Sequence, residues 1–184
     1  NGRRRQRQMC IRDRIKDKIV GANTDGIGFI SSLKKDLSFN INSNTNIMCI
    51  GAGGAAYGIV SSLIDLSPNI IRIINRTKSS GIKLIRHFEK FAQSRTSFET
   101  TLLDSNLIND VDLLVNCTSC GMGGKNPLAI ELSSMNKKSL VYDIVYEPAL
   151  TPLMKLAKDN KLKNTNGFYM LCLLYTSPSP RDNR

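Results

Sequence analysis

Apolar and polar positions alternate in blocks along most of this chain. Short, largely apolar runs predict buried strands, and apolar residues three or four positions apart predict helices that pack on them. The predicted strands cover 15–21, 46–50, 70–74, 97–103, 111–116 and 139–145. The predicted helices cover 27–37, 59–66, 82–91 and 151–157, and Thr151 is expected to be the N-cap of the last. A polar turn is expected over 22–26 before the first helix, where an acidic residue such as Asp25 is usually only a cap. Strands that alternate with helices indicate an α/β fold, Rossmann-like and doubly wound around a mainly parallel sheet.

The turn after the 46–50 strand is rich in glycine and opens the next helix. It reads Gly51-Ala52-Gly53-Gly54-Ala55-Ala56. Glycine permits a sharp turn at Gly51 and lets the backbone approach a pyrophosphate at Gly53, while Ala56 allows the helix to pack closely on the strand. The first N–H groups of the helix then face the phosphates. By itself the motif is equally compatible with an ordinary tight strand-to-helix connection.

The turn after the 70–74 strand carries a cation where an NAD-binding fold has an acid. About 20 residues after the glycines, a carboxylate usually receives the ribose 2′-OH of NAD. Here the sequence is Asn75-Arg76-Thr77-Lys78-Ser79-Ser80. A guanidinium and hydroxyl groups favour a 2′-phosphate, and therefore NADP. The alternative is a solvated turn that caps the following helix.

A further loop at the carboxyl end of a strand contains two cysteines. It follows 111–116 and reads Cys117-Thr118-Ser119-Cys120-Gly121-Met122-Gly123-Gly124. Ligands bind at this edge of open α/β sheets. The C-x-x-C spacing also suggests a metal or redox site, but a zinc site needs two further ligands that the sequence does not offer. Both cysteines are therefore interpreted as small loop residues, and the one histidine, His87, as a surface or packed helix residue.

Charge and hydropathy narrow the classes of function. No apolar run has the length of a membrane span, and no signal peptide is expected. The net charge of +11 suggests an anionic partner, but only 18 basic and 13 acidic residues lie from Ile15 to Leu171, a net charge of +5. That value gives little support for nucleic-acid binding. The cysteines of this region, Cys49, Cys117 and Cys120, predict no disulfide framework and fit a reducing cytoplasm.

The two ends are unlike the middle of the chain and match each other at the level of DNA. Cys172–Ser177 can be encoded by TGTCTCTTATACACATCT, and the reverse complement, read with Gln8 as CAG, encodes Gln8–Asp13. Residues 1–14 and 172–184 are therefore expected to be non-native, translated from opposite copies of one sequencing-library adapter. The alternative is a basic arm that binds nucleic acid, with a proline-rich tail. Resequencing the source DNA without the adapter distinguishes the two.

Six short pieces of the sequence occur in an order that is typical of one enzyme family. They are Asn23-Thr24-Asp25-Gly26, Gly51–Ala55, Asn75-Arg76-Thr77, Asn116–Met122, Tyr142–Tyr146 with Thr151-Pro152-Leu153, and Asn166–Leu171. Together they resemble the shikimate dehydrogenase family over essentially all of 15–171. Glutamyl-tRNA reductases and methylenetetrahydrofolate dehydrogenases have similar glycine turns, but the Asn-Thr-Asp and Asp-Ile-Val-Tyr pieces do not point to them. The resemblance implies that 15–45 is the end of a substrate domain with its connecting helix, and that 46–171 is an NADP-binding domain.

The resemblance implies NADPH-dependent reduction of 3-dehydroshikimate to shikimate in aromatic amino-acid (chorismate) biosynthesis. The nicotinamide delivers hydride to a ring carbonyl, and a positioned acid supplies the proton. The family uses a lysine and aspartate pair, and Asp25 matches the aspartate. The implied substrate-binding residues are Thr24, Asp25 and Tyr146, and no metal is expected. The implied cofactor-binding residues are Gly51, Ala52, Gly53, Gly54, Ala55, Asn75, Arg76, Thr77, Lys78, Thr118, Ile144 and Gly167.

Departures from the family pattern limit what is expected of this chain. The family's substrate domain and catalytic lysine precede Asn23, and its final helix follows Leu171. Apart from the last few residues of the substrate domain, neither is expected in this chain, so we expect NADP(H) binding with negligible dehydrogenase activity. A further family arginine falls at Ser80, which leaves Lys78 or Lys83 to supply charge without a bidentate fork and predicts a weaker NADP preference. A quinate/shikimate dehydrogenase that accepts NAD and a non-catalytic dinucleotide-binding module stay open as alternatives.

Overall fold

The computed structural model describes residues 10–15, 18–35, 37–92, 96–101 and 105–171, and for 10–24 it describes the backbone alone. Of the two segments predicted to be non-native, 172–184 lies outside the described residues. So do residues 1–9 of the other, whereas 10–14 belong to a strand.

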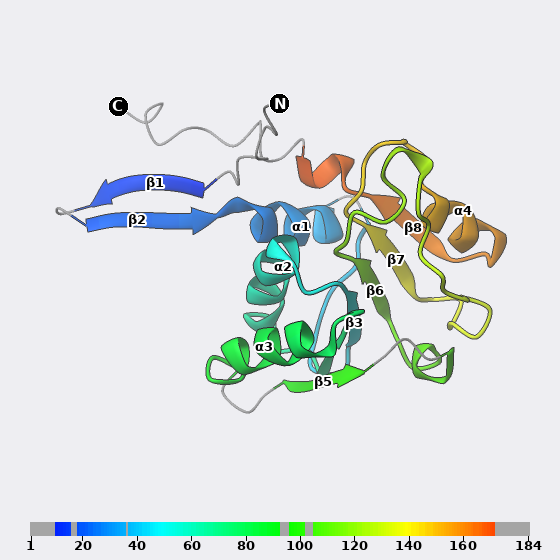
Figure 1. Cartoon of the computed structure of the whole chain (residues 1–184), viewed down its shortest axis with the longest axis horizontal. Coiled ribbons are helices and arrows are strands. Elements are labelled where there is room, and N and C mark those ends of the chain that lie inside the picture. The colour runs from blue at the N-terminus through cyan, green and yellow to red at the C-terminus, as the bar shows by residue number, and fades with distance from the viewer. Residues whose placement is uncertain (1–9, 16–17, 36, 93–95, 102–104, 172–184) are drawn as a thin grey trace.

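Six strands form one parallel sheet in the order β5-β4-β3-β6-β7-β8 (Figure 1). The order reverses next to β3, because β4 and β5 extend the sheet on one side and β6 to β8 extend it on the other. The strands are β3 (Asn46–Ile50), β4 (Ile70–Ile74), β5 (Ser97–Thr101), β6 (Leu113–Asn116), β7 (Leu140–Asp143) and β8 (Lys163–Asn166). The predicted Rossmann-like, doubly wound fold class is confirmed.

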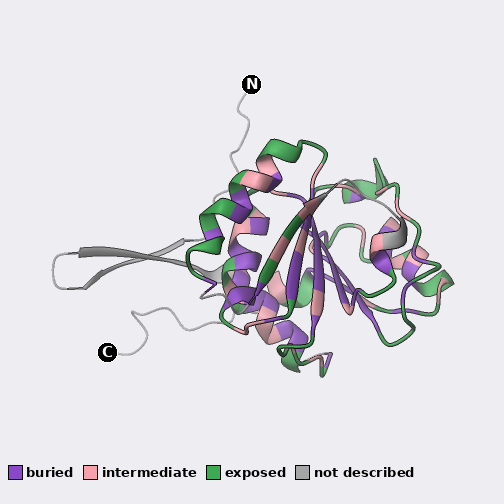
Figure 2. Ribbon diagram, turned by 90° about the horizontal axis from the view of Figure 1, so that it is seen from below, coloured by how far each residue is buried: buried purple, intermediate pink, exposed green. Residues whose placement is uncertain are grey.

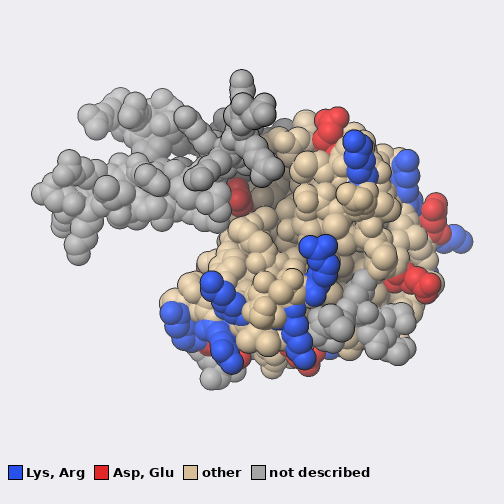
Figure 3. All heavy atoms as spheres, in the orientation of Figure 1, with Lys and Arg blue, Asp and Glu red and all other residues tan. Residues whose placement is uncertain are grey.

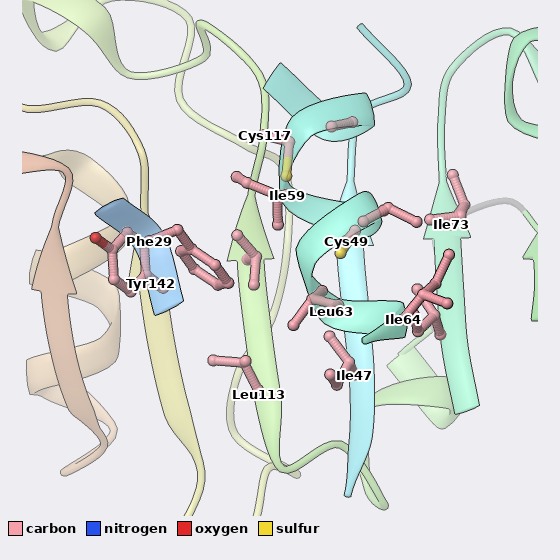
Figure 4. Packing of buried hydrophobic residues seen from close by; sticks show 14 of the residues in the cluster. Phe29, Ile47, Cys49, Ile59, Leu63, Ile64, Ile73, Leu113, Cys117 and Tyr142 are labelled. Atoms are coloured by element: carbon pink, nitrogen blue, oxygen red, sulfur yellow. The ribbon is translucent and has the colours of Figure 1, made fainter. Parts of the chain in front are cut away.

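Helices cover both faces of the sheet (Figures 1 and 2). They are α1 (Thr24–Lys35), α2 (Gly54–Ile64), α3 (Lys78–Glu89) and α4 (Pro152–Asp159), with short 3-10 helices η1 (Ser105–Ile108) and η2 (Met122–Gly124). Successive residues of a strand face opposite sides. Ile47 and Cys49 therefore join the core beneath α1, α2 and α3 (Figure 4), while Met48 and Ile50 join the core beneath α4 and η1. Within the described residues, no helix combines the length and the apolar content of a transmembrane helix.

The start of the described chain differs from its prediction. β1 (Cys10–Ile15) and β2 (Lys18–Asn23) form an antiparallel hairpin that projects from the sheet (Figure 1). α1 then begins at Thr24, so the prediction of a polar turn over 22–26 was wrong. The residue types that favour turns also favour helix starts, and the carboxylate of Asp25 in the first turn interacts favourably with the helix dipole.

Strand β8 was missed by the sequence analysis. Its residues Lys163-Asn164-Thr165-Asn166 lack the branched apolar side chains on which strand prediction depends. Among the residues that the structure describes, β8 is an edge strand and pairs with β7 alone, so its outer side needs no apolar partner. It carries the chain back to the carboxyl edge of the sheet, where Gly167 follows.

Candidate functional site

The turn after β3 is shaped by the loop after β6. Gly51 has φ +111°, a conformation that side chains rarely allow, and its N–H donates to the carbonyl oxygen of Ile74 at 2.7 Å. A Cβ at position 51 would lie 2.8 Å from Cγ2 of Thr118. Both backbone conformation and space therefore require glycine here. The turn lies where the strand order reverses between β3 and β6, the place where open α/β sheets bind ligands.

The start of α2 is open. Gly53 caps the helix without a side-chain hydrogen bond, and a Cβ on it would meet nothing within 4 Å. Gly53 and Gly54 are exposed, Ala52 and Ala55 are half-buried, and Ala56 is fully buried against the sheet. The first turn of α2 contains no acidic residue. Free N–H groups and the positive end of the helix dipole thus face an open surface, which suits a diphosphate.

The turn after β4 presents a cation. The side-chain amide of Asn75 donates to the carbonyl oxygen of Thr77 at 2.8 Å and so closes the turn. Thr77 caps α3 without a side-chain hydrogen bond, and Lys78 is exposed in the first turn. Arg76 is exposed, and no ion pair between it and a carboxylate is found in the described part of the chain. Its guanidinium is therefore available to an anionic ligand.

Further basic side chains lie on α3. Lys83, Arg86 and Lys90 lie on this helix or at its end, and Figure 3 shows basic groups gathered over it. Ser80, where the family pattern has an arginine, is half-buried, and its N–H donates to the Thr77 carbonyl oxygen at 3.0 Å. The resulting positive potential favours a phosphate beside Arg76.

A buried network joins the ends of β6 and β7. The side-chain oxygen of Asn116 accepts hydrogen bonds from the N–H (3.0 Å) and the hydroxyl (2.7 Å) of Thr118. The amide nitrogen of Asn116 donates to Oδ1 of Asp143 at 2.8 Å. The hydroxyl of Thr118 accepts in turn from the N–H of Cys120 at 3.1 Å. This network fixes the loop after β6 and with it the Thr118 side chain that faces Gly51.

Asp143 is the centre of this network, and the sequence analysis missed it. Its fully buried carboxylate accepts from Asn116 (2.8 Å), from the N–H of Val145 (3.1 Å) and from the hydroxyl of Thr151 (2.7 Å). Thr151 is the N-cap of α4, as predicted, and accepts from the N–H of Met154 at 3.2 Å. Burial raises the pKa of Asp143, while its three donors act in the opposite direction. Its only sequence signal was its place in the Asp-Ile-Val-Tyr piece, which supported a resemblance and no chemical role.

Gly167 packs directly on the backbone after β7. A Cβ at this position would lie 2.2 Å from the carbonyl oxygen of Ile144, so only glycine allows so close an approach. The N–H of Ile144 donates to the carbonyl oxygen of Asn116 at 3.1 Å. Thr118, Ile144 and Gly167, three of the residues implied for cofactor binding, thus follow neighbouring strands at the same edge of the sheet.

Asp25 opens α1, and close backbone contacts hold that helix in place. A Cβ on Gly26 would lie 2.5 Å from the carbonyl oxygen of Gly58 in α2, and one on Gly28 would lie 2.9 Å from that of Met170. Asp25 is half-buried, and burial raises its pKa. The helical turn 168–171, which contains Met170, therefore packs beside the start of α1.

Tyr146 follows Val145, whose carbonyl oxygen accepts from the N–H of Gly167 at 3.4 Å at the start of that helical turn. It follows β7 and is 40% exposed. Its neighbour Ile144 contacts Gly167, the residue that starts the turn. The turn thus contacts the segments that carry Asp25 and Tyr146. Thr24, the third residue implied for substrate binding, lies where only the backbone is described.

The cysteines and the histidine have surroundings typical of packing residues. A hydrogen bond with Cys49, and then burial, raises the pKa of Cys117, which keeps this thiol protonated and unreactive. Cys120 is half-buried. In the described ranges, no group of three or more His, Cys, Asp or Glu side chains could hold a metal ion. His87 is exposed on α3, and its ring packs on Phe88 with centroids 4.7 Å apart.

The buried carboxyl group predicts a dependence of stability on pH. Because the folded state raises the pKa of Asp143 above its ordinary value of 3.8, the unfolded chain ionises first as the pH rises. The contribution of Asp143 to stability is therefore fully present below that value and is lost as the pH rises through the folded-state pKa. Relative to an Asp143→Asn variant, the unsubstituted chain should lose stability over this window. Urea unfolding of both chains between about pH 3.5 and pH 7 measures the difference, and a difference that changes in the opposite sense contradicts the raised pKa.

Curated proteins named shikimate dehydrogenase (NADP(+)) are similar to most of this chain. The protein from Geobacter metallireducens is 41% identical over 159 residues, which cover 84% of this chain and 55% of that protein. The protein from Geobacter sulfurreducens is 40% identical over 157 residues, which cover 83% and 54%. The chain therefore spans about half the length of the curated relatives it matches. No protein-family model matches the chain.

Solved structures agree with this similarity. A shikimate dehydrogenase from Aquifex aeolicus is 30% identical with a TM-score of 0.73, and the match covers 89% of this chain and 56% of that one. A shikimate dehydrogenase in complex with NADP+ is 28% identical with a TM-score of 0.69 and the same coverage. The 5-ketofructose reductase of a Gluconobacter strain is 29% identical with a TM-score of 0.76, over 87% of this chain and 57% of that one. The resemblance predicted from the sequence is confirmed.

Proposed function

We propose that this chain, a homologue of NADP-dependent shikimate dehydrogenases over most of its length, is the cofactor-binding part of such an enzyme. The reaction proposed for the whole enzyme is NADPH-dependent reduction of 3-dehydroshikimate to shikimate. The observation that carries the proposal is a pair of turns at one edge of the sheet. The open glycine turn after β3 suits a diphosphate, and the turn with Arg76 after β4 suits a 2′-phosphate.

Each cofactor-binding residue has a role that follows from its place. The N–H groups of Gly53 and Gly54 bind the diphosphate at the start of α2. Arg76 pairs with the 2′-phosphate, assisted by the positive potential of Lys78, and the hydroxyl of Thr77 is available to the same group. Asn75 keeps the turn in this shape. The bound nicotinamide would supply the hydride.

The second half of the site binds the nicotinamide and the substrate. Thr118, Ile144 and Gly167 follow β6, β7 and β8 and line the nicotinamide side of the edge. Asp25 is half-buried, so its carboxylate binds a substrate hydroxyl with less competition from water than an exposed one would. Tyr146, 40% exposed after β7, offers a phenol to the same substrate. We place the reaction in chorismate biosynthesis and in the cytoplasm, where the unpaired Cys49 would stay reduced.

Titration of the purified chain with NADPH tests the proposal. The sequence contains no tryptophan, so the fluorescence of the bound dihydronicotinamide is read with little protein background. We expect saturable binding of NADPH that is tighter than binding of NADH, because only NADPH carries the phosphate for Arg76. The absence of binding contradicts the cofactor role, and equal affinity for the two contradicts the assignment of NADP.

A different substrate on the same cofactor fold is the second candidate. The similarity to 5-ketofructose reductase shows that enzymes named for unlike substrates share this half of the structure. The earlier alternative of a quinate/shikimate dehydrogenase that uses NAD(P) concerns the same choice. Rates with shikimate, quinate and a ketohexose, measured on the full-length protein, would distinguish these enzymes. A non-catalytic binding module would oxidise none of them.

A further inference from the structure

The hydrogen bonds of Asp143 suit the charged form of its carboxyl group. The amide of Asn116 and the N–H of Val145 can only donate to it. The oxygen of Thr151 already accepts from the N–H of Met154, so the Thr151 hydroxyl proton is directed to Oδ2 of Asp143. These three bonds favour the carboxylate and so offset part of the burial that raises the pKa of Asp143, and all three are complete only when the group is ionised.

No cation offsets this charge in the part of the chain that the structure describes. The ion pairs found there join Arg72 of β4 to Glu99 of β5 and to Asp110, and neither involves Asp143. Asp143 itself is 0% exposed. A buried and uncompensated charge acts over a longer range than an exposed one, because little water screens it.

The position of Asp143 at the end of β7 puts its charge near the nicotinamide half of the proposed cofactor. The diphosphate turn follows β3 and the 2′-phosphate turn follows β4, so the adenosine half lies over that side of the sheet. The nicotinamide half must then extend in the other direction, over the ends of β6 and β7. Asp143 is the last residue of β7, and Ile144 and the Asn116-bound Thr118 lie beside it. This step rests on the proposed function.

We propose that Asp143 provides a fixed negative charge that stabilises the oxidised nicotinamide relative to the reduced one. The oxidised ring carries a positive charge and the reduced ring is neutral, so a buried carboxylate attracts only the former. Asp143 thus acts as a positioning residue for the loop after β6 and as an electrostatic group for the cofactor. By favouring NADP+ over NADPH within the site, the charge makes bound NADPH a stronger hydride donor.

The ratio of two dissociation constants tests the inference without any turnover. NADP+ and NADPH are titrated calorimetrically into the unsubstituted chain, into Asp143→Asn and into Tyr142→Phe. Tyr142 is the matched control, because it precedes Asp143 in β7 and its buried hydroxyl, which hydrogen-bonds with Ser32 at 2.8 Å, carries no charge. We expect Asp143→Asn to raise the ratio Kd(NADP+)/Kd(NADPH) about tenfold to twentyfold, the order that Coulomb's law gives for unit charges about 10 Å apart at an effective dielectric constant near 20.

The outcomes separate this inference from the proposed function. Tyr142→Phe should leave the ratio unchanged, even if it weakens both affinities. If Asp143→Asn weakens the binding of NADP+ and NADPH equally, so that the ratio is unchanged, the carboxylate has only a structural role. The inference is then overturned while the proposed function stands. If the unsubstituted chain binds neither form, the proposed function fails and the inference fails with it.

A measurement on the unsubstituted chain covers the case in which Asp143→Asn does not fold. Linkage is reciprocal, so NADP+ must keep Asp143 ionised to a lower pH than NADPH does. The carboxyl 13C resonance of Asp143 is followed against pH in both complexes. A tenfold ratio corresponds to midpoints about one pH unit apart. Coincident midpoints overturn the inference.

Discussion

Replacing Arg76 by alanine is expected to weaken NADPH binding about 10- to 100-fold and to leave NADH binding almost unchanged, because a charge-assisted hydrogen bond contributes about 1.5–3 kcal/mol. The two cofactors differ only in the 2′-phosphate. Arg76 is exposed after β4, and no carboxylate pairs with it among the residues described. The substitution therefore removes a ligand contact and leaves no carboxylate unpaired. Fluorescence titrations with NADPH and NADH at one salt concentration measure the effect.

Arg86 supplies the matched control for loss of charge. It lies in the last turn of the same helix, α3, whereas Arg76 precedes the first turn. We expect Arg86→Ala to change NADPH affinity less than about twofold, because an exposed charge at that distance is screened by salt. Equal weakening by Arg76→Ala and Arg86→Ala would show that the basic surface acts through its general potential. Lys78→Ala should weaken NADPH less than Arg76→Ala does, because an ammonium lacks the bidentate fork.

The fold could be predicted where strands are buried on both faces. β3 and β4 lie in the middle of the sheet, so both faces of each need apolar residues, and their bounds were predicted to the residue. β8 could not be predicted, because an edge strand with the polar sequence Lys-Asn-Thr-Asn forms through backbone pairing with β7. The start of α1 at Thr24 was misjudged because residues of the same type begin turns and helices.

The residues of the site that could be predicted are those whose role depends on neighbours in the sequence. The glycine turn and Arg76 each act within a few residues of chain, so a motif could reveal them. Asp143 could not be found in this way, because its role depends on Asn116 and Thr151, which lie 27 and 8 residues away and meet it only in the folded sheet. For the same reason Gly167 was assigned through resemblance alone, and the structure adds its contact with Ile144.

Alanine at Gly53 is expected to weaken cofactor binding more than about tenfold without destabilising the fold. Gly53 has φ −90° and ψ −172°, which alanine adopts readily, and an added Cβ meets nothing within 4 Å. The free energy of unfolding should therefore change by less than about 0.5 kcal/mol. The same methyl group occupies the open face where the diphosphate must approach the backbone, so NADPH affinity should fall more than about tenfold. Urea unfolding and NADPH titration of the same preparation measure both effects.

Alanine at Gly167 is expected to destabilise the fold, and to weaken NADPH binding as a consequence of that destabilisation. Its Cβ would lie 2.2 Å from the carbonyl oxygen of Ile144, and the atom it meets is backbone held by the bond from Ile144 to Asn116. Because neither segment can move freely, the free energy of unfolding should fall by about 2–4 kcal/mol, with NADPH affinity reduced as the two segments separate. The two variants control for each other, because Gly53→Ala should change mainly the affinity for NADPH and Gly167→Ala mainly the free energy of unfolding.

If Gly53→Ala still binds NADPH at full affinity, the diphosphate does not lie against the start of α2, and the pair of turns no longer supports the proposed function.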